Sequence, residues 1–279
     1  MFINPSDSHV LITGVVRNCG RSINKTISQI DHSTNIFKSK DWYIIESDSI
    51  DDTVNKLSTI RNAHSSFNFL TLGNLTEKHP QRTARIALCR NLYLDYISES
   101  IIKYEYILIF DLDGVNDALT SDALLSCWSR SDWDVCTANQ TLYYDIWALR
   151  HEFLNPVDCW KQYNFLIKQL FLNEEFSLNF SVLSKMISIK PDCDWIEVDS
   201  AFGGLAIIKG DIATKARYVG LDEFNNEVCE HVIYNLNLKS QGAKIFINPK
   251  LINSHKTDHV KSKGFIAKIK RLVKSFFTF

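Results

Sequence analysis

The chain has 279 residues, of which 45% are hydrophobic and 23% are charged, and its formal net charge is −1. This length and composition predict one large α/β domain with a full hydrophobic core. The charge is uneven: residues 256–279 carry seven basic residues and one acid, so their net charge is +6 and that of residues 1–255 is −7. An acidic body without a basic stripe argues against nucleic acid as a partner.

The seven cysteines are scattered and include no CxxC pair. This pattern disfavours a disulfide framework and a zinc cluster, and it is typical of a reducing compartment. The N-terminal sequence has no basic region, and its apolar stretch Val10–Val16 is too short for a signal peptide or a membrane span. We therefore expect a cytoplasmic protein.

In chain order, β-branched runs alternate with helical patterns through the first 140 residues, which predicts a sheet covered by helices. The expected strands are His9–Val16, Trp42–Glu46, Phe67–Leu72, Tyr106–Phe110 and Asp134–Ala138. The expected helices are Gly20–Asp31, Asp51–Asn62 and Gln81–Ile101.

The longest of these helices has an apolar face that is expected to pack on the sheet. Its members are Ile86, Cys89, Leu92, Tyr93, Tyr96 and Ile97. This spacing leaves Arg82, Arg85 and Arg90 toward the periphery. Together with Asn91 they are candidates for binding a diphosphate, because the guanidinium fork matches phosphate oxygens. A solvated cationic face is the alternative.

After residue 140 the pattern becomes mixed. Helices are expected at Val157–Phe171 and Glu227–Lys239, and strands at Phe202–Ile208 and Lys244–Asn248. We expect one domain over residues 1–255 with a nucleotide-binding half (1–140) and an acceptor-binding half (141–255) built on the same sheet. Residues 256–279 form a separate basic tail.

Two aspartates, Asp111 and Asp113, follow the buried run Tyr106–Phe110, at the strand end where open α/β sheets bind ligands. Carboxylates at this spacing can hold one Mn²⁺ or Mg²⁺ ion together with diphosphate oxygens, as in the DxD motif of glycosyltransferases with a GT-A fold. His255, after the last expected strand, is the candidate third ligand. Two solvated turn aspartates are the plain alternative.

The hexapeptide 110–115 also resembles the first motif of haloacid dehalogenase-like phosphatases, in which the first aspartate, here Asp111, is the nucleophile. That motif normally opens its domain, whereas about a hundred residues precede it here. The phosphatase therefore remains an alternative function.

The ends of the first two strands supply candidates for nucleotide binding. Gly14, Arg17 and Asn18 lie at the turn after the first strand, and Glu46 and Asp48 lie at the end of the second. A carboxylate there can accept hydrogen bonds from the N–H edge of guanine or uracil.

Aromatic platforms with nearby carboxylates bind sugars, and one short segment combines both. Its candidates are Tyr144, Asp145, Trp147 and Arg150.

Glu230, followed by His231, lies near the start of a helical pattern whose buried face leaves Glu230 free to point into a cleft. Glu230 is a candidate general base or sugar ligand, and stabilisation of the helix N-terminus is its alternative role. Asp145 and Glu230 are the candidate catalytic carboxylates.

Together these segments resemble, over about residues 10–250, the fungal capsule-associated α-1,3-mannosyltransferases and their bacterial relatives. The matching pieces are Glu46–Ser49 with Asp51 and Thr53, Arg82 with Ile86-Ala87 and Arg90-Asn91, the acidic site at Asp111, Tyr144–Arg150, and Cys229-Glu230 before Ile247–Pro249. Val198–Gly204 is similar to the family's small-residue stretch, which implies that Gly203 and Gly204 approach the sugar.

The resemblance implies a GT-A fold with a Rossmann-like mixed sheet flanked by helices, a nucleotide-sugar donor, Mn²⁺ or Mg²⁺, and retention of anomeric configuration. The motif reads Asp-Leu-Asp, whereas fungal members tend to an Asn-Asp site, and this difference leaves the donor open between GDP- and UDP-linked sugars. A non-catalytic sugar-nucleotide-binding protein is a further alternative.

The tail carries apolar residues at helical spacing with lysines and an arginine between them. The apolar members are Phe265, Ile266, Ile269, Leu272, Val273, Phe276 and Phe277. We expect a basic amphipathic helix over residues 264–279 that contacts the inner face of an anionic membrane, where lipid-linked glycans are extended. Docking on the domain or on a partner protomer is the alternative.

Overall fold

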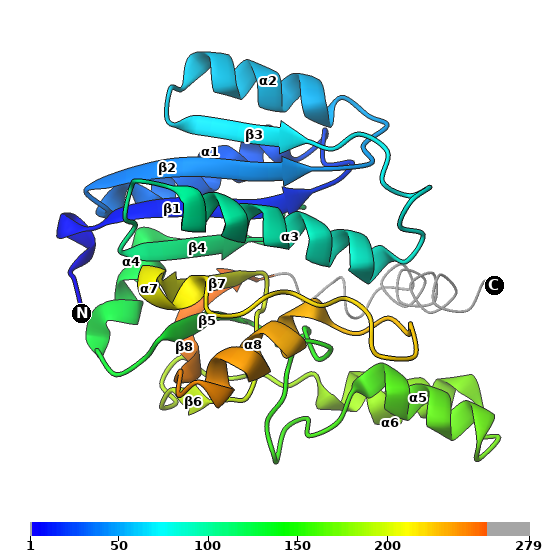
Figure 1. Cartoon of the computed structure of the whole chain (residues 1–279). Coiled ribbons are helices and arrows are strands. Elements are labelled where there is room, and N and C mark those ends of the chain that lie inside the picture. Colours follow the sequence, from blue (N-terminus) through cyan, green and yellow to red (C-terminus); the bar gives the residue numbers. More distant parts are fainter. Residues whose placement is uncertain (1, 256–279) are drawn as a thin grey trace.

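The structure, a computed structural model, describes residues 2–255. Four parallel strands form the first part of its sheet: β1 (His9–Val16), β2 (Ser39–Glu46), β3 (Phe67–Thr71) and β4 (Tyr106–Phe110). They lie in the order β3-β2-β1-β4 (Figure 1). Every residue of β4 is buried, as expected for a central parallel strand that helices cover on both faces.

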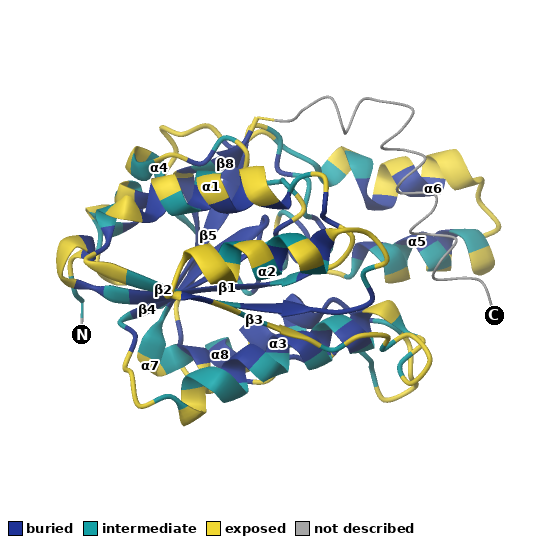
Figure 2. Cartoon of the chain, turned by 90° about the horizontal axis from the view of Figure 1, so that it is seen from above, coloured by how far each residue is buried: buried dark blue, intermediate teal, exposed yellow. Residues whose placement is uncertain are grey.

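Three helices connect these strands: α1 (Ile23–Ser33), α2 (Thr53–Ala63) and α3 (Arg82–Glu99). Because successive strand residues point to opposite faces, Leu11 packs with α3 while Val10 and Ile12 pack with α1. Figure 2 shows α1 and α2 on one face of the sheet and α3 on the other. All strands and helices predicted before residue 140 are confirmed, with ends shifted by three residues or fewer.

The second half of the chain extends the same sheet. Its strands are β5 (Val135–Gln140), β6 (Ile196–Glu197), β7 (Leu205–Lys209) and β8 (Ile245–Ser254). Strand β7 lies between β4 and β5 and runs antiparallel to both, and the order ends β4-β7-β5-β8-β6. The predicted fold class, an α/β fold with a Rossmann-like mixed sheet flanked by helices, is confirmed.

Helix α8 (Glu230–Ser240) packs beside α3 on one face of the sheet, and the short α4 (Ser121–Leu125) lies on the other (Figure 2). A hairpin of two helices, α5 (Cys159–Lys168) and α6 (Glu174–Ser181), projects beyond the sheet (Figure 1). The helical pattern predicted α5 and α8 but not α6. The remaining elements are α7 (Gly210–Ala213) and the 3₁₀ turns Pro5–Asp7, Thr34–Ile36, Ser126–Ser129 and Leu183–Lys185.

The orientation of α3 corrects the sequence-based expectation. Cys89 and Tyr93 are buried as predicted, but Arg85 and Arg90 are buried as well, with 8% and 3% exposure. The helical spacing of the apolar residues predicted a peripheral position for these arginines. Both guanidinium groups instead have acceptors inside the protein, which is the condition under which arginine is buried.

The predicted amphipathic helix of residues 264–279 lies outside the described residues. Within residues 2–255, no helix is both long enough and apolar enough to cross a membrane.

Candidate active site

A cavity of about 400 Å³ opens at the carboxyl ends of β1, β2 and β4. It is closed on the opposite side by α3, by the first residues of α8 and by the segment after β5. Twelve residues predicted for the site line it: Arg17, Asp48, Arg82, Arg85, Arg90, Asp111, Asp113, Tyr144, Asp145, Trp147, Glu230 and His231. These residues come from six separate segments of the chain and meet only in the folded protein.

The two motif aspartates, Asp111 and Asp113, line the cavity directly after β4. The backbone of Asp111 is held in place because its N–H donates to the carbonyl of Gly204 (2.9 Å) and its carbonyl accepts from Asn116 (2.8 Å). Asp113 is exposed. Burial raises the pKa of Asp111 to about 7; Arg90 lowers it, while the charges of Asp113, Asp145 and Glu230 raise it. The site therefore concentrates negative charge that a cation would relieve.

Arg90 joins α3 to α8 beneath the motif. Its Nε donates to Oε1 of Glu230 at 3.1 Å, and its Nη2 lies 3.4 Å from Oδ1 of Asp111. The guanidinium also lies over the rings of Phe202 (5.3 Å) and Tyr218 (5.6 Å). Glu230 is 5% exposed, so the ion pair between Arg90 and Glu230 is removed from solvent. A carboxylate bonded in this way is held in a defined orientation at the cavity wall.

The predicted sugar-binding segment forms another wall through Tyr144, Asp145 and Trp147. Oδ2 of Asp145 accepts a hydrogen bond from the N–H of Gly203 at 3.0 Å. Burial raises the pKa of Asp145, although the N–H groups of Gly203 and Ala148 oppose this effect. Gly203 and Gly204 have φ of +68° and +83° and do not line the cavity, but they hold Asp145 and Asp111 through their backbones.

His231 is stacked on Phe202, with ring centroids 3.7 Å apart, and it lines the cavity. Burial and the nearby charge of Arg90 hold the pKa of His231 well below its ordinary value, so the imidazole is neutral. Among the described residues, its Nε2 atom is buried without a hydrogen-bond partner. A buried polar atom of this kind at a cavity wall is available to a ligand hydroxyl.

At the other end of the cavity, β2 ends in two buried acids. Glu46 accepts hydrogen bonds from Ser49 N–H (2.9 Å) and from the Thr71 hydroxyl, so it ties β2 to β3 and does not line the cavity. Asp48 lines the cavity at φ +58°. Burial raises the pKa of Asp48, but hydrogen bonds from Thr76 and Leu75 bring it below its ordinary value.

Three arginines line the cavity together with Asp48, and one of them, Arg85, lies beside it. Nε of Arg85 lies 3.7 Å from Oδ2 of Asp48, while its Nη1 donates to the carbonyls of His79 (2.5 Å) and Pro80 (2.7 Å). Arg17 and Arg82 are exposed and line the cavity. They add two guanidinium groups to the lining of the cavity.

Five other predicted residues serve the scaffold and lie outside the cavity lining. A Cβ atom at Gly14 would lie 2.2 Å from the carbonyl oxygen of Phe110, so glycine there lets β1 approach β4. Asn18 binds Ser49 and Ile50, and Asn91 binds the backbone of Tyr218. The other two are Arg150 and His255.

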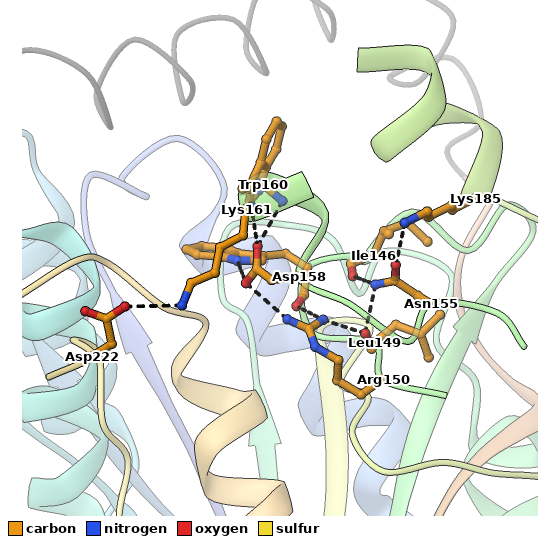
Figure 3. A network of polar contacts seen from close by, with 10 residues as sticks. Ile146, Leu149, Arg150, Asn155, Asp158, Trp160, Lys161, Lys185 and Asp222 are labelled. Carbon is orange, nitrogen blue, oxygen red and sulfur yellow. Dashed lines mark hydrogen bonds and ion pairs between the residues drawn. The ribbon is translucent and has the colours of Figure 1, made fainter. Parts of the chain in front are cut away.

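Arg150 belongs to a polar network around Asp158 (Figure 3). Its guanidinium donates to the carbonyls of Trp147 (3.0 Å) and Leu149 (2.6 Å) and to Oδ2 of Asp158 (3.1 Å). The same Oδ2 accepts from the indole N–H of Trp147 at 3.0 Å. Oδ1 of Asp158 accepts from the N–H groups of Trp160 and Lys161 and so caps α5. Asp158 therefore couples the start of α5 to an aromatic side chain of the cavity.

The metal set predicted from sequence is not assembled. His255 is exposed, and its Nδ1 lies 2.9 Å from the hydroxyl of Thr141. Between residues 2 and 255, no group of three or more His, Cys, Asp or Glu side chains is arranged to hold a metal ion. Asp111 and Asp113 alone still fit a hard cation, because Mg²⁺ is commonly bound by one or two carboxylates together with substrate phosphates and water.

Sequence reasoning missed Phe202, which lines the cavity and contacts both Arg90 and His231. The sequence pattern predicts a strand from Phe202, whereas β7 begins at Leu205. The only sequence signal was its position directly before Gly203 and Gly204, whose left-handed backbone turns the chain there.

No protein-family model matches the chain, and no curated protein matches it. Among solved structures, it is similar to the mannosyltransferase PcManGT from Pyrobaculum calidifontis in complex with GDP-Man and Mn²⁺, with 11% identity and a TM-score of 0.48 over 97% of this chain and 66% of that one. S. aureus TarS 1–349 is 11% identical, with a TM-score of 0.47 over 95% of this chain and 64% of that one. The chain spans less than two thirds of the length of these structures.

Proposed function

We propose that the protein is a metal-dependent glycosyltransferase that transfers a hexose from a nucleotide sugar to a glycan or lipid-linked acceptor in surface polysaccharide synthesis. One observation carries the proposal: a single cavity holds the Asp111-Leu112-Asp113 motif between an arginine-rich end at β1 and β2 and an aromatic, acidic end at residues 144–147. A nucleotide sugar has the same order of chemical groups: base, diphosphate and sugar.

The donor phosphates would lie between Arg17, Arg82 and Arg85 on one side and the aspartate motif on the other. Asp111 and Asp113 would hold a divalent ion, which supplies charge neutralisation for the departing nucleoside diphosphate. Guanidinium groups already in place bind the diphosphate without reorganisation, which favours the charge that develops as the bond to the sugar breaks.

The sugar and the acceptor would bind at the other end. The faces of Tyr144 and Trp147 suit sugar rings, while Asp145 and His231 offer polar atoms for their hydroxyls. Glu230 is held at the cavity wall by Arg90, at 3.1 Å. We propose retention of anomeric configuration, as the family resemblance implies. We assign Glu230 to the positioning of the donor sugar.

The base would lie beside Asp48. Its Oδ2 atom has no hydrogen-bond partner in the described part of the chain, and a carboxylate oxygen accepts N–H groups of guanine or uracil. We propose GDP-linked and UDP-linked hexoses as the donor class. GDP-mannose is the first donor to test, because the family resemblance points to mannose.

The decisive test is Asp113→Asn, compared with Asp192→Asn as a matched exposed aspartate outside the cavity. We expect the first change to lower sugar transfer and donor hydrolysis with Mn²⁺ by about two to three orders of magnitude, since charge stabilisation of the leaving group is lost. The second should leave both unchanged, and both variants should unfold like the wild type because the side chains are exposed.

Equal turnover in the two variants would refute the metal role of Asp113. A phosphatase would instead release phosphate from an aryl phosphate and form an acyl phosphate at Asp111. The arrangement is less suited to that reaction, because no lysine lines the cavity within the described residues.

We also propose that residues 264–279 hold the enzyme on the cytoplasmic face of a membrane. This segment lies outside the described residues, and its basic amphipathic sequence supports the proposal. Removal of residues 264–279 should reduce sedimentation with anionic vesicles, and equal sedimentation would refute the contact.

A further inference from the structure

The segment 153–180 exposes an unusual number of large apolar side chains. Eight of its large hydrophobic residues are at least 36% exposed, which is half of all large hydrophobic residues so exposed among residues 2–255. Most belong to the hairpin of α5 and α6, which we call the apolar hairpin (residues 159–181). Its exposed members are Phe165, Leu170, Phe171, Leu172, Phe176 and Phe180. Patches of this kind mark interaction surfaces.

The core of the protein does not account for these side chains. The inner faces of α5 and α6 are buried through Tyr163, Leu166 and Leu178. Phe176 and Phe180 lie one turn apart on the outer face of α6 and stack on each other in the open, with ring centroids 5.9 Å apart. The apolar hairpin is therefore apolar on both its inner and its outer side.

The tip of the hairpin also exposes apolar side chains, and one of them has a strained backbone conformation. Phe171 has φ of +54° and is 87% exposed, between the exposed Leu170 and Leu172. Left-handed backbone is the usual place for glycine, and a bulky residue there is an outlier. A strained phenylalanine that buries nothing within the described protein points to a role in contact with something else.

The hairpin lies on the cavity side of the molecule. Figures 1 and 2 show α5 and α6 projecting past the end of the sheet toward which β1 and β2 run, the end at which the cavity opens. Helix α5 is capped by Asp158, whose carboxylate accepts a hydrogen bond from the indole of Trp147 in the cavity wall. An acceptor held at the hairpin would thus be close to the sugar end of the site.

The described chain also ends beside the base of the hairpin. His255 contacts Thr141, and the carbonyl of Thr141 accepts from the hydroxyl of Ser188, three residues after the turn that follows α6. Beyond this point the sequence carries a net charge of +6 and apolar residues at helical spacing. Two apolar segments, one of them strongly basic, therefore start from neighbouring points of the surface.

We propose that the apolar hairpin is a membrane-contact element: its tip and outer face insert into the interface of an anionic lipid bilayer. The tip is flanked by Lys168 on one side and by Glu174 and Glu175 on the other, so it carries no excess of positive charge and apolar burial supplies the binding of the hairpin. The cationic residues after His255 supply the attraction to anionic lipid. The inference rests on the proposed membrane contact only for this second part and is independent of the proposed sugar transfer.

The test compares vesicle sedimentation of the full chain and of two variants, using phosphatidylcholine vesicles with and without phosphatidylglycerol. The hairpin variant combines Leu170→Ser, Phe171→Gly and Leu172→Ser. The matched control combines Ile50→Ser and Ile101→Ser, which are 94% and 99% exposed elsewhere on the protein. We expect the hairpin variant to bind anionic vesicles about tenfold more weakly and the control to bind like the wild type.

Folding is monitored through Phe171→Gly alone, which should raise the melting temperature or leave it unchanged, because glycine relieves the left-handed backbone, yet should weaken vesicle binding. Unchanged binding in the triple variant would overturn the proposal. A second result would also overturn it: the wild type is a dimer, the triple variant is a monomer, and both bind vesicles equally. The exposed face of the hairpin would then be the contact with a second copy of the chain. Transfer to a soluble acceptor should be equal in all these proteins, so a failure of membrane binding is distinct from a failure of the proposed chemistry.

Discussion

The guanidinium of Arg90 lies within reach of two carboxylates, those of Glu230 and Asp111, and it is almost entirely removed from solvent. A buried ion pair holds both of its members in a defined orientation, and the loss of one member leaves the other without compensation. The pair therefore combines a structural role, joining α3 to α8, with a role at the cavity.

We predict that Arg90→Ala lowers the free energy of unfolding by about 3–5 kcal/mol, because Glu230 then remains as an unpaired buried charge. Urea denaturation measures this effect. The double variant Arg90→Ala with Glu230→Gln should recover part of the loss, since the remaining group is neutral. If the double variant were as unstable as Arg90→Ala alone, the loss would come from the packing of Arg90 rather than from its charge.

A second prediction at this scale concerns Asp111, whose pKa is raised from 3.8 to about 7 by burial, against the opposing charge of Arg90. Between these two pH values the folded protein retains a proton that the unfolded chain loses. The contribution of Asp111 to stability therefore falls as pH rises through this window. Asp111→Asn should match the wild type near pH 4 and be more stable above pH 7 in the absence of metal, as measured by urea denaturation.

The matched control for this pH series is Asp192→Asn, an exposed aspartate outside the cavity. Its stability should follow that of the wild type at every pH. A constant difference between Asp111→Asn and the wild type from pH 4 to pH 8 would show that Asp111 does not titrate in this window.

At the scale of secondary structure, helices α5 and α6 each begin with a side-chain N-cap, but the two capping residues differ in their other contacts. Asp158 caps α5 and also holds Trp147 and Arg150, whereas Asn173 caps α6 through the N–H of Phe176 and lies outside the cavity lining. The two caps form a natural pair for separating helix stability from cavity geometry.

We predict that Asn173→Ala lowers the free energy of unfolding by roughly 1 kcal/mol through loss of the cap, and that Asp158→Ala lowers it further because Arg150 also loses its carboxylate partner. Only Asp158→Ala should also raise the KM for the sugar nucleotide or the acceptor, because Trp147 loses the acceptor of its indole N–H. Steady-state kinetics and urea denaturation of both variants check this. Equal kinetics in the two variants would show that Asp158 acts on the helix alone.

Helix α3 illustrates why the arginine positions were mistaken. Its local pattern predicted a face of apolar residues, and Cys89 and Tyr93 follow that prediction. Arg85 is buried because it donates to the carbonyls of His79 and Pro80, directly before the helix, and lies 3.7 Å from Asp48 after β2. Arg90 is buried because its acceptor lies at the start of α8, 140 residues later. Helical periodicity indicates only whether a side chain prefers the buried or the exposed face of a helix. It contains no information on partners from distant segments.

For the whole molecule, the central property is that one sheet carries both halves of the chain, so that a single cavity meets residues from β1 to α8. A ligand that spans this cavity contacts both halves and should stabilise the folded protein as one unit. The free energy of unfolding rises with the ratio of the ligand concentration to its Kd.

We predict that a nucleotide diphosphate sugar with Mn²⁺ raises the melting temperature more than the nucleotide alone or Mn²⁺ alone. Comparison of GDP-linked and UDP-linked sugars in a thermal-shift assay identifies the base. Asp113→Asn should reduce the shift produced by the pair, and Asp192→Asn should not. The absence of a shift with every sugar nucleotide would contradict donor binding at this cavity.

The sequence by itself determined the positions of the first five strands and the three helices between them, because β-branched runs and helical periodicity are local properties. It also placed Asp111 and Asp113 at the end of a buried strand. Only the tertiary structure decided that β7 runs antiparallel between β4 and β5, that Phe202 joins the cavity, and that His255 does not line it. These features depend on contacts between segments far apart in the chain, whose free energies are absent from any local window of sequence.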